Sequence, residues 1–474
     1  IQKAFQSLEV GLFGLEAKIT DYRPLDLSKI SFGTAFRLLK VKQALDEGHS
    51  IDTLYNQTKI DKWFLSQVKQ LSFLSTYKFD FNVKNIFLLK QEGYSDNQIA
   101  KIMSLTENEI YSFRQKNKIF PTFKSVDTCA AEFEAKTPYC YSTYEIENEV
   151  IPLEGKKILI LGSGPTRIGQ GVEFDYCCVQ AVIGLKEAGF KTIMYNCNPE
   201  TVSTDFDISD RLYFEPLTFE HVMNVINFEK PDGVLIQFGG QTPLNIANKL
   251  KSENVKIIGT DSSSIDLAED RKKFGEILDT LNIHAPKWGT AYSIEEALSI
   301  AEKIKYPVLV RPSYVLGGRG MEIVYDNNDL KTYVAKAALV SGDHPILIDD
   351  FLEDAFEFDV DALCDGNDVY VAGIMQHIEE AGIHSGDSSC VLPAYALSVS
   401  DKDIIKNQTK ALALELKTKG LINIQFALKD NIVSVLEVNP RASRTIPFVS
   451  KVTNIPLAKI AAQLAVGKKL SEFE

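Results

Sequence analysis

The chain has 474 residues, a net charge of −13, 45% hydrophobic residues and 24% charged residues. This balance is typical of a globular protein with large cores, and the length predicts about three domains. The negative charge argues against non-specific binding to nucleic acid, since even the basic group Arg271-Lys272-Lys273 has acidic neighbours. No apolar run reaches the roughly 18 residues of a membrane span, so a membrane protein is excluded as well.

The seven cysteines and six histidines indicate neither disulfides nor a zinc site. Cys177 and Cys178 are adjacent, no C-x-x-C pair occurs, and the histidines lack spacings such as H-E-x-x-H. We therefore expect a reducing compartment and a cytoplasmic protein. The chain opens at Ile1 without a methionine or a secretory signal, so we also expect it to be a fragment of a longer protein.

The first 120 residues predict helices joined by short loops. Apolar residues cluster at helical spacing, as in the series that runs from Phe36 through Leu39 to Leu45, and turn signals such as Glu47-Gly48 interrupt the series. No catalytic arrangement stands out here. We interpret residues 1–150 as an all-helical domain for packing or association, with an aromatic connector at its end.

Residues 151–265 predict a doubly wound α/β domain. Residues 156–161 form a short, mainly apolar run followed by glycine, which is typical of a buried parallel strand. A helix is expected near 177–188, and further strands are expected near 192–196 and 234–238. Strands and helices that alternate at this spacing favour a parallel sheet.

A glycine-rich loop at 162–171 follows the first of these strands. A dinucleotide-binding G-x-G-x-x-G motif would need glycine at position 167, where the chain has Arg167, so an NAD site is excluded. The loop could still form the rim of a site for a small anion, together with the loops at 196–200 and 239–243. The alternative is that all three loops are simply tight turns.

From residue 266 onward the pattern predicts an α+β domain, which we place at 266–474. A charged helix at 266–281 precedes a strand at 306–312, and Arg311 near the strand's end is followed by a glycine-rich loop at 313–320. Backbone N–H groups and a guanidinium suit the phosphates of a nucleoside triphosphate. The Walker pattern G-x-x-x-x-G-K-[ST] is absent.

Acidic and apolar residues alternate from Glu357 to Ala362. A strand would place Glu357, Asp359 and Asp361 on one face and the apolar residues in a core. Three carboxylates on one face are costly unless cations or hydroxyl groups receive them. The alternative is a strand face exposed to solvent.

A second group of oxygen-bearing side chains lies near the end of the chain. Glu437 and Asn439 are two residues apart on a predicted strand, and another predicted strand offers Gln425. These hard oxygen ligands, with one carboxylate among them, suit Mg²⁺ that is shared with triphosphate oxygens. Arg441 and Arg444 follow at once, where they could meet a phosphoryl group in transfer.

Several longer strings resemble the large subunit of carbamoyl phosphate synthetases, an ATP-grasp family. They are G-P-T-R-I-G-Q-G-V-E-F-D-Y-C-C (164–178), N-C-N-P-E-T-V-S-T-D (196–205), R-P-S-Y-V-L-G-G-R (311–319), H-S-G-D-S (384–388) and E-V-N-P-R (437–441). The large subunit has two similar halves, and these sequence strings resemble the second one. The stretch D-T-C-A-A-E-F (127–133) is similar to the connector of the family's oligomerisation domain.

The resemblance implies a site for ATP with Mg²⁺ or Mn²⁺, and K⁺ often accompanies these metals in the family. The backbone at 350–352 would face adenine, and Glu357 would accept the ribose hydroxyls. Metal ligands would be Gln425, Glu437 and Asn439. The implied nucleotide site comprises Arg271, Arg311, Asp350, Leu352, Glu357, Gly382, Ile383, His384, Ser385, Gln425 and Glu437.

The implied reaction is transfer of the ATP γ-phosphoryl group to carbamate, with Arg311, Arg441 and Arg444 balancing the developing charge. In the family, the first half of the large subunit makes carbamate, a small glutaminase subunit supplies ammonia, and the product feeds arginine and pyrimidine biosynthesis. The resemblance also implies a homo-oligomer formed through the helical domain.

Compared with the family, we expect this sequence to lack the first half's ATP site and the terminal allosteric domain. Two alternatives remain open at this point. One is another carboxylate-activating ATP-grasp ligase, such as a biotin carboxylase. The other is a catalytically idle fragment that acts as an oligomerisation scaffold.

Overall fold

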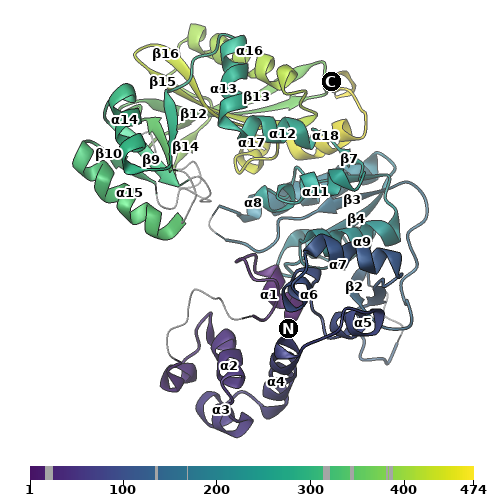
Figure 1. Cartoon of the computed structure of the whole chain (residues 1–474). Coiled ribbons are helices and arrows are strands. Elements are labelled where there is room, and N and C mark those ends of the chain that lie inside the picture. The colour runs from purple at the N-terminus through teal and green to yellow at the C-terminus, as the bar shows by residue number, and fades with distance from the viewer. Residues whose placement is uncertain are drawn as a thin grey trace. The chain divides into compact units, whose positions relative to one another are not determined.

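The computed structural model describes residues 1–16, 25–133, 137–167, 169–312, 321–341, 346–379, 383 and 388–473. The chain forms two compact units (Figure 1). Unit 1 comprises Ile1–Glu154, Tyr195–Pro199 and Arg211–Lys230, and unit 2 comprises Gly155–Met194, Glu200–Asp210 and Pro231–Glu474. The predicted fold class, a helical N-terminal region followed by mixed α/β and α+β structure, is confirmed.

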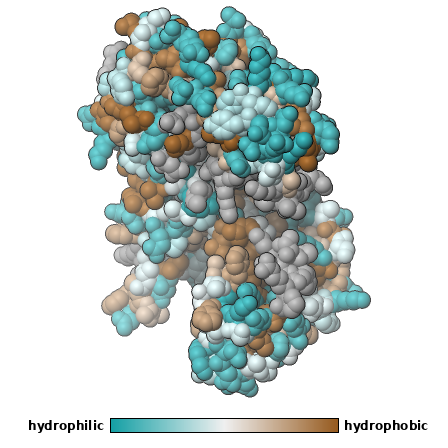
Figure 2. Space-filling view, turned by 90° about the vertical axis from the view of Figure 1, so that its left-hand side faces the viewer, coloured by the Kyte–Doolittle hydropathy of each residue, from teal (hydrophilic) through white to brown (hydrophobic). Residues whose placement is uncertain are grey.

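None of the helices in the described part of the chain is long and apolar enough to cross a membrane. The face drawn in Figure 2 mixes hydrophilic and hydrophobic residues. All seven cysteines lie among the described residues, where none of them forms a disulfide bond.

Unit 1 begins with short helices, and a side chain caps the N-terminus of most of them. Ser95 and Thr106 each form a capping box with the residue three positions later, which pairs the first free N–H groups of these helices. The apolar faces pack into one core that contains Val41, Leu65 and Ile99. The helices are α1 (Gln2–Ser7), η2 (Leu27–Ser31), α2 (Arg37–Asp46), α3 (Ile51–Thr58), α4 (Lys62–Thr76), α5 (Val83–Gln91), α6 (Asp96–Met103) and α7 (Glu107–Lys116).

Strands and one further helix complete unit 1. Strand β2 (Tyr139–Thr143) pairs antiparallel with β1 (Thr122–Ser125) and parallel with β5 (Arg211–Phe214). Helix α9 (Phe219–Glu229) follows β5. The connector expected between the helical region and the first sheet therefore contains strands.

A buried cluster of charged side chains joins α5, α6, α7 and α9. Asp96 contacts the Lys90 Nζ at 3.2 Å and the Arg114 Nη2 at 2.6 Å, and Glu220 also pairs with Lys90. All four side chains are almost completely buried. Burial disfavours every one of these charges, so each depends on its partners.

Unit 2 starts with a sheet in which strands lie in the order β4-β3-β6-β7, with parallel pairing of β3 with β6 and of β6 with β7. Strand β3 (Lys157–Leu161) is buried at every position, as its apolar run predicts. The other elements here are α8 (Val172–Glu187), β4 (Lys191–Asn196), η3 (Val202–Thr204), β6 (Gly233–Leu235), α10 (Gln241–Leu244), α11 (Ala247–Ser252) and β7 (Ile257–Ile258).

The charged helix predicted at 266–281 is in fact two helices, α12 (Ser262–Glu269) and α13 (Arg271–Thr280). Asp270 separates them. Its backbone is extended, and its carboxylate accepts hydrogen bonds from the N–H groups of Lys272 and Lys273. An N-cap of this kind starts a new helix where the periodicity alone suggested continuity.

Two antiparallel sheets make up most of the remaining chain. The four-stranded sheet has the order β10-β9-β11-β8, and helices α14 (Ile294–Ile304) and α15 (Asn327–Ser341) lie side by side against it (Figure 1). The five-stranded sheet has the order β14-β13-β12-β15-β16. Its core also includes residues of α12, α13 and α16 (Val399–Glu415). The strands are β8 (Trp288–Ala291), β9 (Val308–Pro312), β10 (Glu322–Val324), β11 (Ile346–Asp350), β12 (Phe356–Cys364), β13 (Val369–His377), β14 (Cys390–Val391), β15 (Gly420–Lys429) and β16 (Ile432–Asn439).

Helices α17 (Ile446–Thr453) and α18 (Leu457–Ala465) follow β16, and a short turn, η5 (Leu470–Glu472), comes last. Helix α18 packs tightly on α8. A Cβ atom at Gly184 would lie 2.6 Å from the carbonyl oxygen of Lys459, so only glycine fits at this approach. Gln463 donates to the Gly184 carbonyl at 3.0 Å. Because α8 contacts β3 and α18 contacts β15, this packing connects the first sheet of unit 2 to the five-stranded sheet.

The buried charge cluster of unit 1 generates a stability prediction. Glu220→Gln should lower the free energy of unfolding by about 3–5 kcal/mol, because it leaves buried cations short of a partner. Urea unfolding of the full chain, followed by circular dichroism, measures the change. The control is Asp52→Asn, which breaks an exposed ion pair with Lys62 and should have little effect. If the two substitutions changed the free energy of unfolding equally, the predicted contribution of the buried cluster to stability would be wrong.

Candidate nucleotide and metal site

The pairing register of three strands gathers polar side chains on one face of the five-stranded sheet. Gln425 on β15 lies directly opposite Glu437 on β16 and opposite Asp359 on β12. Asn423, two residues earlier on β15, lies opposite Asn439. Directly paired residues point to the same face of a sheet. The predicted metal ligands Gln425, Glu437 and Asn439 therefore share one face.

A β-bulge sets this register. The pairing of β15 with β16 shifts between Gln425 and Phe426, and Leu436 is the extra residue on the bulged strand. Asn439 donates to a Glu437 carboxylate oxygen at 2.9 Å. The two amides and the carboxylate offer hard oxygens, and a set with one carboxylate fits a Mg²⁺ ion that takes its other ligands from phosphate and water. No group of three or more His, Cys, Asp or Glu residues in the described ranges could hold a metal by itself.

A small apolar cluster lies beside this face. Leu352, Ala355, Ala427 and Leu436 pack together, and Ala427 is the strand partner of Glu357. The cluster joins the segment after β11 to strands β15 and β16, so it lies where the four-stranded and five-stranded sheets meet. A flat apolar patch next to a carboxylate can hold an aromatic heterocycle that carries hydroxyl groups. Sequence reasoning placed Leu352 and Glu357 here but missed the other members.

Asp350, at the end of β11, has part of its backbone already engaged. Its N–H group donates to the Lys287 carbonyl at 2.8 Å, and the next N–H group, of Phe351, donates to the Pro307 carbonyl at 3.3 Å. These two N–H groups are therefore not available to a ligand, and any contact of this segment with adenine would involve its other backbone groups. Burial raises the pKa of the Asp350 carboxyl, although the nearby Lys429 and Lys287 oppose this.

Two arginines of the predicted nucleotide site converge on one carboxylate that sequence reasoning missed. Arg271 on α13 forms an ion pair with Asp349, and the Arg311 Nε lies 3.2 Å from the other Asp349 oxygen. The Arg311 Nε and Asp349 Oδ2 atoms are both buried, but their orientation does not satisfy the geometry of a hydrogen bond. Burial raises the pKa of Asp349 to about 6, against the opposing effect of Arg311. Two cations around one carboxylate leave an excess positive charge that suits an anion.

The acidic strand is buried on both faces, so the interpretation of a solvent-exposed face is wrong for Asp359 and Asp361. These carboxylates are 2% and 1% exposed. Asn423 donates to both of them at 3.1 and 3.0 Å, and the hydroxyl groups of Ser443 and Thr445 donate to Asp361. Hydroxyl groups thus receive part of the charge, as we expected for carboxylates gathered on one strand face. Burial raises the pKa of Asp361 to about 6.

His377 on β13 lies between the other two carboxylates of this strand. Its Nε2 atom is 2.7 Å from Asp359, and its Nδ1 atom is 3.4 Å from Glu357. Burial lowers the pKa of His377, but the interactions with Asp359 and Glu357 outweigh it and raise the value to about 9. A protonated imidazole therefore joins Glu357 to the buried network. No motif around His377 pointed to this position.

The loop after β16 carries the two predicted phosphoryl-binding arginines. Arg441 has a lowered pKa because it is buried, while the carboxylates of Glu437 and Glu269 favour its charge. The Ala442 N–H group donates to the Gln237 carbonyl at 2.9 Å. Arg444 is partly exposed. The loop thus lies between the five-stranded sheet and the segment that follows β6.

The glycine loops after β3 and β6 are joined by one glutamine side chain. Gln170 donates to the carbonyls of Ser163 and Gly239, and it accepts from the N–H group of Gln241 at 3.3 Å. Gly240 has a φ of +72°, which favours glycine. The two loops are thus turns that the Gln170 side chain holds together. That they form the rim of a site for an anion stays a prediction.

Part of the expected site lies outside the described residues. This applies to the glycine-rich loop at 313–320 and to Gly382, His384 and Ser385. Ile383 is described and is 40% exposed.

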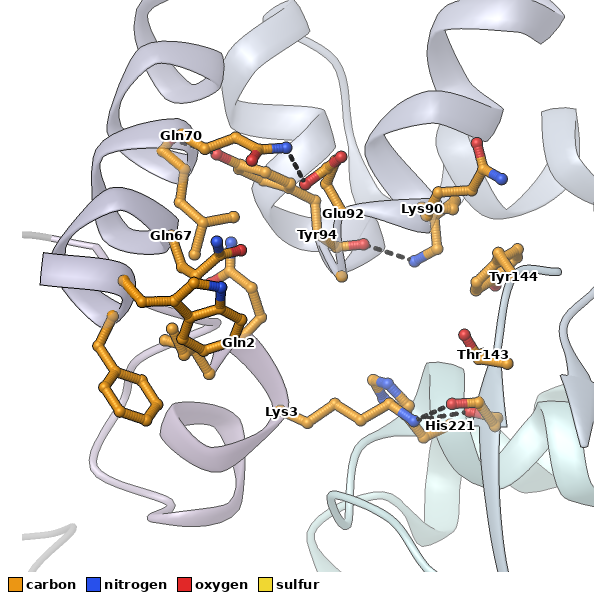
Figure 3. Close-up of a pocket in the computed structure, with 17 residues that line it drawn as sticks. Gln2, Lys3, Gln67, Gln70, Lys90, Glu92, Tyr94, Thr143, Tyr144 and His221 are labelled. Carbon is orange, nitrogen blue, oxygen red and sulfur yellow. Dashed lines mark hydrogen bonds between the residues drawn. The ribbon is translucent and has the colours of Figure 1, made fainter. Parts of the chain in front are cut away.

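Unit 1 contains a cavity of about 550 Å³ (Figure 3). Trp63 and Gln67 of α4 line it, together with Lys3 and the buried His221. Lys3 donates to the Ser142 hydroxyl at 2.9 Å, and Figure 3 shows the Lys3 side chain beside His221. Burial lowers the pKa of His221 to about 3, so this histidine is neutral. The cavity contains none of the residues that the sequence predicted for the site.

Comparison with known families gives three matches along the chain. Residues 1–118 match the carbamoyl-phosphate synthetase large chain oligomerisation domain, residues 154–267 match the carbamoyl phosphate synthase preATP-grasp domain, and residues 270–473 match the carbamoyl-phosphate synthase L chain ATP binding domain.

Curated relatives agree with these matches. The carbamoyl phosphate synthase large chain of Archaeoglobus fulgidus is 54% identical over all of this chain, and that of Vibrio cholerae is 50% identical. The chain spans 45% of the length of each of these relatives.

Solved structures share the fold at low identity. The biotin carboxylase domain of the Hydrogenobacter thermophilus 2-oxoglutarate carboxylase, solved with MgADP, ADP and bicarbonate, has a TM-score of 0.55 at 20% identity over 66% of this chain and 70% of that one. The biotin carboxylase of Campylobacter jejuni, solved as a β,γ-ATP complex, has a TM-score of 0.54 at 19% identity over 66% of this chain and 72% of that one. The family matches and the identities of 50% and more over the whole chain lead to one conclusion: the chain belongs to the carbamoyl phosphate synthase large-chain family.

Proposed function

We propose that this chain binds ATP with Mg²⁺ and transfers the γ-phosphoryl group to carbamate, which gives carbamoyl phosphate. The observation that carries the proposal is the shared sheet face of Gln425, Glu437 and Asn439, next to the arginine-bearing loop that follows β16. These three side chains would hold Mg²⁺, which supplies positive charge beside the phosphate oxygens. Mn²⁺ fits the same oxygen ligands. K⁺ is proposed only because it often accompanies these metals in the family.

The remaining parts of the site have matching roles in this proposal. Leu352, Ala355, Ala427 and Leu436 would pack against adenine, and Glu357 would accept hydrogen bonds from the ribose hydroxyls. Arg271 and Arg311 would exchange their shared contact with Asp349 for the phosphate groups. Arg441 and Arg444 would balance the charge that develops on the transferred group. Positioning and charge neutralisation carry most of such a transfer.

The relatives support this reaction over that of a biotin carboxylase. Likeness to the biotin carboxylase structures is below 25% identity and concerns the fold alone, whereas the carbamoyl phosphate synthases reach 54% identity. We also propose the domain division 1–150, 151–265 and 266–474, which the family matches at 1–118, 154–267 and 270–473 support. The steps of the whole synthase, with a glutaminase partner and a first half that makes carbamate, are likewise proposals.

A helical region that mediates self-association is a further part of the proposal. Helix α4 exposes large aromatic side chains, with Trp63 at 62% and Phe73 at 62% exposure, and Phe64 and Tyr77 are also exposed. Residues 1–118 match a domain described as an oligomerisation domain. A second copy of this chain would cover such apolar area.

The reverse reaction tests the proposed activity. The chain should form ATP from carbamoyl phosphate and MgADP, as measured by luciferase luminescence. Glu437→Gln should lower the rate about 100-fold, because one charged oxygen of the site is lost. Glu302→Gln, an exposed position on α14, is the matched control and should keep the wild-type rate. An intact wild-type chain without signal would favour the scaffold alternative.

Light scattering after size exclusion tests the self-association. The wild-type chain should run as an oligomer, and Trp63→Glu combined with Phe73→Glu should shift it toward the monomer, since a buried charge opposes an apolar contact. Tyr292→Glu is the control, because Tyr292 is 73% exposed and lies in unit 2. A wild-type monomer, or a double variant that remains oligomeric, would contradict this use of α4.

A further inference from the structure

We propose that Asp361 is a positioning residue that anchors the loop carrying Arg441 and Arg444, so that these arginines meet the phosphoryl group in a fixed place. This inference rests on the phosphoryl transfer proposed above. Asp361 lies on β12, while the loop follows β16, so the anchor joins segments about eighty residues apart in the chain.

The carboxylate of Asp361 binds the loop on both sides of Arg444. The Ser443 hydroxyl donates to Oδ1 at 2.8 Å, and the Thr445 hydroxyl donates to Oδ2. The two hydroxyl oxygens are also 2.7 Å apart. Arg444 therefore lies between two residues whose side chains are held by one carboxylate, which restricts the backbone on which its guanidinium is mounted.

The anchor is itself fixed by the sheet. Asp361 is 1% exposed, and Oδ1 accepts a further hydrogen bond from Asn423 Nδ2 at 3.0 Å. Asn423 lies directly opposite Asp361 on β15, and it also donates to Asp359. An acceptor held in this way by a neighbouring strand has little freedom to move, and rigid support of this kind is what a positioned site requires.

The other side of the loop has its own contact. The Ala442 N–H group donates to the Gln237 carbonyl at 2.9 Å, and the Gln237 amide donates to the Thr260 carbonyl at 3.0 Å. The loop is thus held from β12 through side chains and from the end of β6 through the backbone. Loss of the Asp361 contacts would remove the side-chain part of this support.

A carboxylate is suited to this task for a chemical reason. It accepts hydrogen bonds only, and it can serve the Asn423, Ser443 and Thr445 donors at once. An asparagine at position 361 would present an N–H₂ group to at least one of these donors. Asp361→Asn therefore keeps the size of the side chain but breaks the pattern of acceptors.

A role in stability alone is the competing explanation, and Asp365 provides the matched control. Asp365 follows the same strand, is 3% exposed, and accepts from the N–H groups of Asn367, Asp368 and Leu470. It has no hydrogen bond with the arginine-bearing loop among the contacts of the described residues. Asp365→Asn thus removes a comparable buried acceptor at a place where the arginines should not respond.

The experiment compares full-length chains in three measurements: the ATP-forming rate from carbamoyl phosphate and MgADP, the Kd of MgADP by calorimetry, and amide hydrogen exchange of residues 439–446. Asp361→Asn and Thr445→Val should lower kcat about 10- to 100-fold, with the MgADP Kd unchanged within about twofold. Exchange of the loop should be faster in both variants. Thr445→Ser retains the hydroxyl group and should retain the wild-type rate and exchange, as should Asp365→Asn.

Wild-type kcat together with wild-type loop exchange in Asp361→Asn and Thr445→Val would overturn the anchor, as would a loss of kcat in Asp365→Asn equal to that in Asp361→Asn. If Asp361→Asn does not fold, the comparison of Thr445→Val with Thr445→Ser decides. A wild-type chain that forms no ATP would instead overturn the proposed function, and the hydrogen-exchange measurement would still decide whether Asp361 holds the loop.

Discussion

The candidate site depends on how β15 pairs with β16. The bulge at Leu436 lets Gln425 face Glu437 while Asn423 faces Asn439, so that the oxygen ligands lie on one face and Phe426, Val435 and Val438 lie in the core. A slip of one residue would turn every side chain of the strand to the opposite face. The apolar side of these strands therefore fixes the position of the polar side. The same register places Ala427 beside the apolar cluster next to Glu357.

The polar face of the sheet is unusual because much of it is buried. Buried carboxylates are costly unless their hydrogen bonds are complete. Here Asn423 serves Asp359 and Asp361, His377 serves Asp359, and hydroxyl groups of the loop after β16 serve Asp361. Each partner comes from another strand or loop. Because each buried carboxylate needs these partners, the network fixes the positions of β12, β13, β15 and the arginine-bearing loop relative to one another.

Local patterns in the sequence predicted the parts of this structure that local physics determines. Alternation from Glu357 to Ala362 predicted β12, the spacing of Glu437 and Asn439 placed them on one strand face, and the run at 156–161 predicted the buried β3. The break at Asp270 was missed because helical periodicity continues across it. A cap is a property of one side chain and its backbone, and periodicity does not report it.

Partners distant in the chain could not be predicted in the same way. Asp349 lies beside a residue that the sequence did single out, yet its contacts with Arg271 and Arg311 arise only when α13, β9 and β11 come together. His377 stands in no recognisable motif. Ser443 and Thr445 look like ordinary loop residues until β12 supplies the carboxylate they bind. The burial of Asp359 and Asp361 likewise depends on both neighbouring strands.

Anomalous diffraction from crystals of the chain grown with ADP and Mn²⁺ tests the central claim most directly. A cation site on the shared face of β15 and β16 predicts a Mn²⁺ peak within about 2.5 Å of oxygens of Gln425, Glu437 and Asn439, next to the nucleotide phosphates. A well-ordered nucleotide whose Mn²⁺ lies on other residues, with Glu437 turned away from it, would contradict the account.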